Sequence, residues 1–405
     1  MYLLGVLVAV LCAAAGTAHA QSTSGIAGFD DGFFIQSQNG DHRLVFGGVV
    51  QEDGRFSVDE PLPITNTFTL RKLRPILTGR VARYFDVRLM PDFGNGATTL
   101  LDAWLDVRFS RALRLRLGKD KTPVGHELLQ GDAFLLFPER ALASSLVPNR
   151  DVGIEAHGDL GGGRVTYSGG LFNGVPDGVS AGGQGDSNND KDAAGFIAVR
   201  PFRTPAGMGV LDGFGIHVGG SIGRESGPLP AFRTSAGQTY FSYVPATAAS
   251  GRRRRMTPAV FYYHKAFGGF AEYVRSAQEV VRGGVEQAVA NHAWAVTASY
   301  VLTGEATSDR GVRPRAPFDP RARHWGALQI AARFSELTVD DDVFVSGFAA
   351  PGASSGARQW TVGVNWYPVQ WVKWYATFER TTFNESPVAA RPAEDVILFR
   401  FQLAF

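Results

Sequence analysis

The chain has almost no cysteine: Cys12 is the only one among its 405 residues. It lies within residues 1–20, a segment without Lys, Arg, Asp or Glu that carries an apolar run from Leu3 to Ala15 and ends in Ala18-His19-Ala20. We interpret residues 1–20 as a secretory signal peptide that is cleaved after Ala20. The exported chain, residues 21–405, would then contain neither a thiol nor a disulfide.

Long hydrophobic runs are also missing, since no stretch reaches the roughly 20 apolar residues that a membrane-spanning helix needs. Even so, 44% of the residues are hydrophobic, 12% are aromatic and 49 are glycine. An exported chain without spanning helices is either a soluble secreted protein or a membrane barrel, whose strands each give a weak signal. The aromatic and glycine content favours the barrel.

An excess of one charge is lacking too, because the net charge is only +2. Lysine is scarce, since six of the 40 basic residues are lysine and the other 34 are arginine. Arginine has a planar fork that suits oxyanions, although a general bias towards arginine would give the same count. Total charge therefore does not identify a partner, and the positions of the charges matter more.

Polar and apolar side chains alternate along many short segments separated by turn signals. In Leu113 to Leu117 leucine and arginine alternate, and in the last segment Phe399, Phe401 and Phe405 oppose Arg400 and Gln402. Counting from His42 gives about sixteen such segments, an even number, as in bacterial barrels. The sequence therefore predicts an all-β fold: one antiparallel transmembrane β-barrel over residues 21–405, integral to a bacterial outer membrane.

Connections between the predicted strands alternate between short and long. Long ones at 122–149, 174–193, 223–256, 338–357 and 384–394 suit outer loops. We expect the third outer loop, 122–149, to fold into the barrel, because Phe134 to Val147 is compact and apolar. The stretch 304–322 falls on the periplasmic side, where it is much longer than a turn requires.

Several segments resemble the phosphate-selective porin family (porins O and P), and they occur in the family's order along the chain. They are Leu117 to Gly125 with Glu127, Pro138-Glu139-Arg140, Asn149 to Gly153, Ala298 to Glu305, Gly363 to Pro368 and Arg400 to Phe405. The resemblance implies a sixteen-stranded trimer in which the third outer loop, the fifth outer loop and a long periplasmic segment narrow the pore. It also implies an arginine ladder that leads to a lysine-lined anion site, with no cofactor.

Candidate pore-lining residues are the basic side chains that the alternation places on the inner face. They are Lys72, Arg74, Arg80, Arg88, Arg108, Arg114 and Arg116. Positive groups on a pore wall attract anions and replace part of their water shell. A second interpretation stays open, in which Asp86, Asp102 and Asp106 pair with these cations and the wall is a lattice of salt bridges.

Two further groups of candidates come from the segments beside these strands. Lys119 and Lys121 precede the third outer loop, but alternation from Leu117 turns them towards lipid unless the strand ends at Gly118. The long periplasmic segment supplies Arg313, Arg315, Arg321 and Arg323, which could hold phosphate through paired hydrogen bonds.

The run Arg252 to Arg255 is predicted to lie in the fifth outer loop, 223–256. It could collect anions, bind lipopolysaccharide phosphates or simply be solvated, whereas export argues against a nucleic-acid partner. The expected function is a passive anion channel for phosphate or polyphosphate, set in outer-membrane lipid and lipopolysaccharide as a homotrimer. The alternative is a general or sugar-conducting porin. A barrel enzyme such as a lipase is disfavoured, because His157 and His217 point inward without a serine partner, and no metal site is expected.

Overall fold

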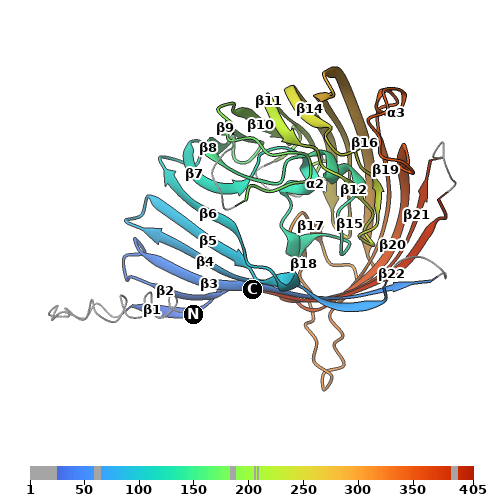
Figure 1. Cartoon of the computed structure of the whole chain (residues 1–405). Helices are drawn as coiled ribbons and strands as arrows, with labels where there is room; N and C mark the ends of the chain where they lie inside the picture. Colours follow the sequence, from blue (N-terminus) through green and yellow to red (C-terminus); the bar gives the residue numbers. More distant parts are fainter. Residues whose placement is uncertain (1–24, 59–64, 183–187, 205–206, 208, 385–390) are drawn as a thin grey trace.

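In the computed structural model, residues 25–58, 65–182, 188–204, 207, 209–384 and 391–405 are described. The predicted signal peptide, residues 1–20, lies outside these residues. The main sheet has 18 strands. Two of them, β1 (Ile26–Phe29) and β2 (Phe33–Gln36), form a hairpin at the seam, and the other sixteen close into an antiparallel barrel, as predicted (Figure 1).

The wall strands follow one another around the barrel in chain order, and the last pairs with the first. They are β3 (Arg43–Ser57), β4 (Thr67–Val81), β5 (Phe85–Asp92), β6 (Thr99–Arg108), β7 (Arg114–Lys121), β8 (Arg150–Leu160), β9 (Val165–Phe172), β10 (Asp192–Val199), β11 (Gly215–Pro228), β14 (Ala248–His264), β15 (Phe267–Arg282), β16 (Val285–Val301), β19 (Ala327–Thr338), β20 (Gly356–Val369), β21 (Val372–Phe383) and β22 (Glu394–Ala404).

The remaining elements are short and lie in the connections. They are the strand pairs β12 (Phe232–Arg233) with β13 (Thr239–Phe241) and β17 (Thr307–Ser308) with β18 (Gly311–Val312), the helices α2 (His126–Leu129) and α3 (Asp342–Val345), and the 3₁₀ turns η1 (Gly94–Gly96), η2 (Asp132–Phe134) and η3 (Leu142–Leu146). None of the described helices is long and apolar enough to cross a membrane.

The alternation decides which side chains face the lumen. Arg333 and Arg400 are almost completely buried inside the barrel, whereas their neighbours Ile330 and Phe399 are exposed on the outer surface. Leu113 and Leu117 are exposed in the same way. Apolar side chains on the outside of a closed barrel form the band that contacts lipid.

Tight turns close several hairpins, and glycine makes them possible. Gly283 and Gly284 join β15 to β16 with φ angles of +57° and +81°. A two-residue hairpin turn with both φ angles positive matches the twist of the strands, and glycine adopts it without a steric penalty.

The prediction for the fifth outer loop was wrong at both ends. The connection between β11 and β14 spans only 229–247, so Arg252 to Arg255 belong to β14, where Arg252 pairs with Arg224 of β11. Four consecutive arginines show no alternation of polar and apolar residues, which hides the strand in the sequence. Arg253 and Arg255 are buried on the lumen side, while Arg252 and Arg254 are exposed on the outer face.

Candidate functional site

The connection between β7 and β8, residues 122–149, carries α2, η2 and η3 and is drawn within the ring of strands (Figure 1). Its carbonyl oxygens accept hydrogen bonds from side chains of four neighbouring wall strands, β19 to β22. Lys373 Nζ of β21 donates to Leu135 O at 2.7 Å, and Asn365 Nδ2 of β20 donates to Leu136 O at 3.0 Å. Arg400 of β22 donates to Pro138 O at 2.5 Å.

Glu272 of β15 fixes the start of this connection. Its carboxylate accepts the backbone N–H groups of His126 at 2.5 Å and Glu127 at 3.1 Å. Glu127 in turn accepts the Ala141 N–H and the Ser144 hydroxyl, both at 2.9 Å. These bonds satisfy free N–H groups at the start of α2 and tie the two halves of the connection together.

A cavity of about 350 Å³ lies against this connection on the side of the long loop 229–247, and we call it the outer cavity. Its basic lining residues are Arg71, Lys72, Arg74, Arg140, Arg150 and Arg233, and its acidic ones are Asp132 and Glu139. The lining therefore carries six positive and two negative side chains, a difference of +4. Such an excess in a hollow with low-dielectric walls attracts anions.

Each carboxylate of the outer cavity lies among basic groups. Asp132 is 3.0 Å from Lys72 Nζ and 2.7 Å from an Arg140 nitrogen, and it also contacts Arg74. Burial alone would raise the pKa of Asp132, but these cations hold it well below its usual range. Asp132 is therefore ionised and neutralises part of the surrounding charge.

Glu139 shows the same balance, with an oxygen 2.6 Å from Arg55 and 3.1 Å from Arg71. Burial opposes ionisation of Glu139, and the neighbouring arginines, Arg71 foremost, lower its pKa despite that. The acidic tip of the connection is thus bound electrostatically to β3 and β4.

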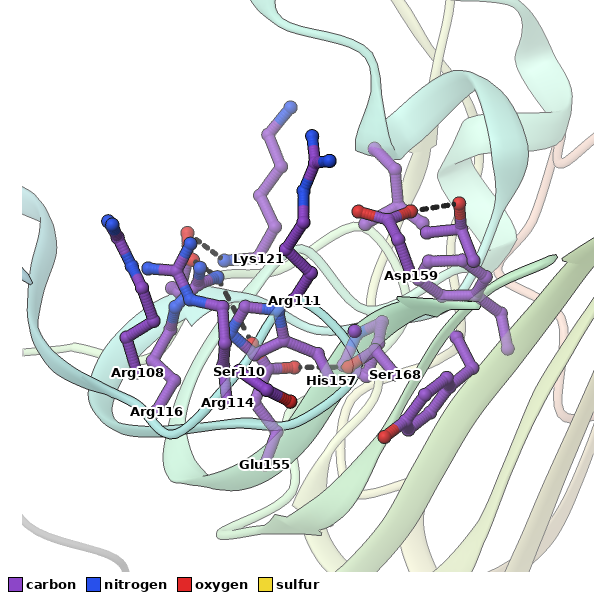
Figure 2. Close-up of a pocket in the computed structure, with 17 residues that line it drawn as sticks. Arg108, Ser110, Arg111, Arg114, Arg116, Lys121, Glu155, His157, Asp159 and Ser168 are labelled. Carbon is purple, nitrogen blue, oxygen red and sulfur yellow. Dashed lines mark hydrogen bonds and ion pairs between the residues drawn. The ribbon is translucent and has the colours of Figure 1, made fainter. Parts of the chain in front are cut away.

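A second cavity of about 460 Å³, the periplasmic cavity, includes Ser110 and Arg111 of the short β6–β7 turn (Figure 2). Its charged lining residues are Arg108, Arg111, Arg114, Arg116 and Lys121 with Asp120, Glu155 and Asp159. Arg114 lies 2.7 Å from Asp86, and Arg116 lies 3.0 Å from Asp106. The salt-bridge lattice that the sequence left open is therefore present in this part of the wall.

Five of the seven predicted strand residues line the outer cavity or the periplasmic cavity. Lys72 and Arg74 line the outer cavity, while Arg108, Arg114 and Arg116 line the periplasmic cavity. Arg80 and Arg88 line neither, and they pair with Asp86 at 3.1 Å and Asp102 at 3.0 Å.

Lys121 does not lie on the lipid side, where alternation along β7 would place it. β7 does not end at Gly118 but continues to Lys121, and Lys121 still lines the periplasmic cavity and donates to Leu128 O and Gln130 O, both at 2.6 Å. Gly118 has a φ of +124°, an irregularity that alternation cannot anticipate. Lys119 lines neither cavity and donates to Ala181 O at 2.5 Å.

The predicted arginines of the long periplasmic segment are not brought to either cavity. Arg313 is exposed and lies 3.0 Å from Asp31, and exposed Arg315 donates to Thr303 O at 2.9 Å. Arg321 and Arg323 are exposed beside the Asp319–His324 bridge. From the same segment, Thr307 is within hydrogen-bonding distance of inward-facing Gln329, so the β17–β18 pair approaches the lumen instead.

Sequence reasoning missed four basic residues of the outer cavity, Arg71, Arg140, Arg150 and Arg233. Alternation places Arg71 outside, next to Lys72, but Arg71 is the extra residue of a bulge in β4 and has no partner on β3. Arg140 and Arg233 belong to connections, where no alternation exists. Arg140 and Arg150 could have been found, because both are part of motifs that carry the family resemblance, Pro138-Glu139-Arg140 and Asn149 to Gly153.

The comparisons with known proteins agree with this geometry. Residues 46–405 match the family described as phosphate-selective porin O and P. The chain belongs to that family. No curated protein sequence matches the chain. In the described parts of the chain, no group of three or more His, Cys, Asp or Glu side chains could hold a metal ion.

Solved outer-membrane proteins share the porin fold at low sequence identity. The outer membrane channel DcaP of Acinetobacter baumannii has a TM-score of 0.60 and 10% identity, covering 94% of this chain and 100% of that chain. An anion-selective porin from Comamonas acidovorans has a TM-score of 0.56 and 10% identity, covering 90% and 100%. The trimer form of OmpT from Vibrio cholerae has a TM-score of 0.56 and 12% identity, covering 90% and 99%. This porin is an integral outer-membrane channel.

Proposed function

We propose that this porin is a passive, anion-selective channel that conducts small oxyanions such as phosphate or polyphosphate. The observation that carries the proposal is the outer cavity, in which six basic side chains face two carboxylates beside the connection that crosses the lumen. The family description and the anion-selective porin among the similar structures support the same choice. Here the connection 122–149 is the constriction.

Arginine suits the weak, reversible binding of an oxyanion that a channel needs. Its planar N–H fork can bind two oxygens of a phosphate group, yet each contact in a hydrated pore is weak enough to break. Arg233 is the simplest donor of this kind, because its side chain is exposed and has no partner among the described residues. An entering anion can therefore be bound there without first displacing a carboxylate.

A bilayer experiment tests the proposal. Phosphate added to a chloride solution should reduce the chloride current of the purified porin, and Arg233→Gln should weaken that block by a few-fold. Arg315→Gln is the matched control, because Arg315 is also an exposed arginine but lies outside the outer cavity. Equal block in the wild type and in both variants would show that phosphate does not bind in the outer cavity.

The alternative, a general or sugar-conducting porin, is favoured by one observation. In the periplasmic cavity, Arg114 and Arg116 are neutralised by Asp86, Asp106, Asp120 and Glu155. If that wall alone governed transport, the channel would show no charge preference. Liposome swelling with uncharged sugars separates the two functions, since rapid sugar entry without phosphate block supports the alternative.

We also infer that the porin is a homotrimer in outer-membrane lipid and that residues 21–405 form its single domain after cleavage of 1–20. The trimer form of OmpT, a protein with a similar fold, supports the first inference. Native mass spectrometry of the protein purified from outer membranes tests both. A trimer of chains that begin at Gln21 is expected, and a monomer or an uncleaved chain would contradict one inference each.

A further inference from the structure

Four arginines lie on the outer, lipid-facing surface of three neighbouring strands, and we call them the outer arginine cluster. They are Arg224 of β11, Arg252 and Arg254 of β14, and Arg275 of β15. All four are exposed, whereas the residues next to them in sequence, such as Arg253 and Val274, are buried on the lumen side. Alternation therefore places the whole cluster outside the barrel.

The strand register brings these four side chains together. Arg224 and Arg252 are direct cross-strand partners. Arg254 pairs with Ile222 and Ala277, which places it diagonally from both Arg224 and Arg275 on the same face. Direct partners in a sheet have Cβ atoms about 5 Å apart and diagonal neighbours about 7–8 Å apart. Like charges this close are destabilising unless an anion lies between them.

No carboxylate of the described residues pairs with the cluster. Glu279 of β15 accepts the backbone N–H of Arg252 at 2.7 Å and forms no ion pair with a guanidinium of the described residues. Exposed arginines elsewhere on the outer surface are different: Arg358 lies 2.7 Å from Glu336, and Arg380 lies 2.8 Å from Asp395. The outer arginine cluster thus lacks counter-ions where other outward arginines have them.

The height of the cluster along the strands indicates which layer of the membrane surrounds it. Arg252 and Arg254 lie near the start of β14, at the end of the barrel that carries the long connections and so faces the outside. Below them the outer face is apolar, with Met256 and Val260 exposed. Tyr273 and Trp294 pair across β15 and β16 one step below Arg275, as aromatic residues do at a membrane interface. The cluster is therefore level with the headgroups of the outer leaflet.

We propose that the outer arginine cluster binds the phosphate groups of lipopolysaccharide in the outer leaflet. The phosphates would supply the counter-ions that the chain lacks, and four guanidinium forks at neighbouring positions can bind a phosphorylated diglucosamine at several points. This site is separate from the lumen and does not depend on which solute the channel conducts.

Native mass spectrometry in detergent tests the proposal with purified bis-phosphorylated lipid A as the probe. The double variant Arg252→Gln with Arg254→Gln should bind the lipid about tenfold more weakly than the wild type, because two charge-assisted contacts are lost. The matched control, Arg358→Gln with Arg380→Gln, should bind it as the wild type does. Equal binding by the two double variants would overturn the proposal.

Two further measurements need no variant. The wild type should lose affinity for lipid A from which both phosphates have been removed, and unchanged affinity would show that only the acyl chains bind. Excess inorganic phosphate should displace the bound lipid only weakly, whereas complete displacement would show a site for the free anion and overturn the proposal. Single-channel conductance of the Arg252 and Arg254 double variant should remain that of the wild type, which confirms that the barrel is folded.

Discussion

Asp132 and Glu139 each lie among three basic side chains in a cavity that we propose attracts anions. Asp132 forms ion pairs with Lys72, Arg74 and Arg140, so its carboxylate competes with a passing anion for these basic groups. The carboxylate thus keeps the anion site from becoming so attractive that the ion cannot leave. Weak binding is what conduction requires.

Replacing Asp132 by Asn tests this role. The net charge of the lining should rise from +4 to +5, so phosphate should block chloride current at lower concentration. The buried cations lose their partner, and we expect the connection to lose up to about 3 kcal/mol of local stability. Reversal potentials and limited proteolysis measure the two effects. Asp212→Asn is the control, because Asp212 lies in the β10–β11 connection, outside both cavities.

The pKa shifts of these carboxylates predict a pH dependence. Both pKa values are lowered in the folded porin, so both groups stabilise the fold above their unfolded pKa, roughly 4. That contribution is lost as the pH falls through the lower, folded pKa. Because Asp132 remains charged in the folded pore, the difference in anion selectivity between the wild type and Asp132→Asn should be constant from about pH 8 to pH 4. A difference that disappears as the pH falls from about 7 to 5 would show that Asp132 is protonated there, and would contradict this assignment.

At the residue scale, alternation predicts which wall side chains face the lumen and fails where the strand is irregular. Arg114 and Arg116 lie on the predicted side because β6, β7 and β8 pair in regular register. Arg71 does not, because its register depends on a bulge with β3 that no local pattern reveals. The ion pairs of Asp132 could not be predicted either, since they join residues far apart in the sequence.

The element that we propose as the constriction is the connection 122–149, and β15 holds its start through Glu272. Replacing Glu272 by Gln leaves one acceptor oxygen where two now accept backbone N–H groups, and a hydrogen bond contributes roughly 0.5–1.5 kcal/mol net. The connection should then move more freely, so single-channel conductance should rise and its noise should increase. Glu286→Gln, an exposed position on neighbouring β16, should change neither.

If Glu272→Gln left both conductance and noise unchanged, the start of α2 would not control the pore. Sequence alone predicts that this connection exists and is apolar enough to pack, because Phe134 to Val147 is an unusual composition for a solvated loop. It does not identify Glu272 as the anchor, since a buried acid on a strand has no local signature. The Arg252 to Arg255 strand escaped prediction for a related reason: uniform charge conceals a period of two.

At the scale of the whole molecule, the barrel closes where β22 pairs with β3, and the terminal Phe405 packs its ring against Phe29 and Phe33 of the N-terminal hairpin. The two ends of the chain therefore meet at the seam. The strand number and closure were predictable because alternation repeats in most of the wall strands. The segment 304–322 was less predictable. Its length was evident from the sequence, but the sequence did not show that Thr307 approaches the lumen while Arg321 and Arg323 stay exposed.

We propose that the lumen prefers anions because basic side chains outnumber acidic ones in the outer cavity. The most direct test is the reversal potential of the purified porin in a planar bilayer across a potassium chloride gradient. We expect a potential with the sign of preferential chloride permeation, which moves towards zero in the Arg233→Gln variant. A potential of zero, or one with the sign of potassium permeation, would contradict anion preference.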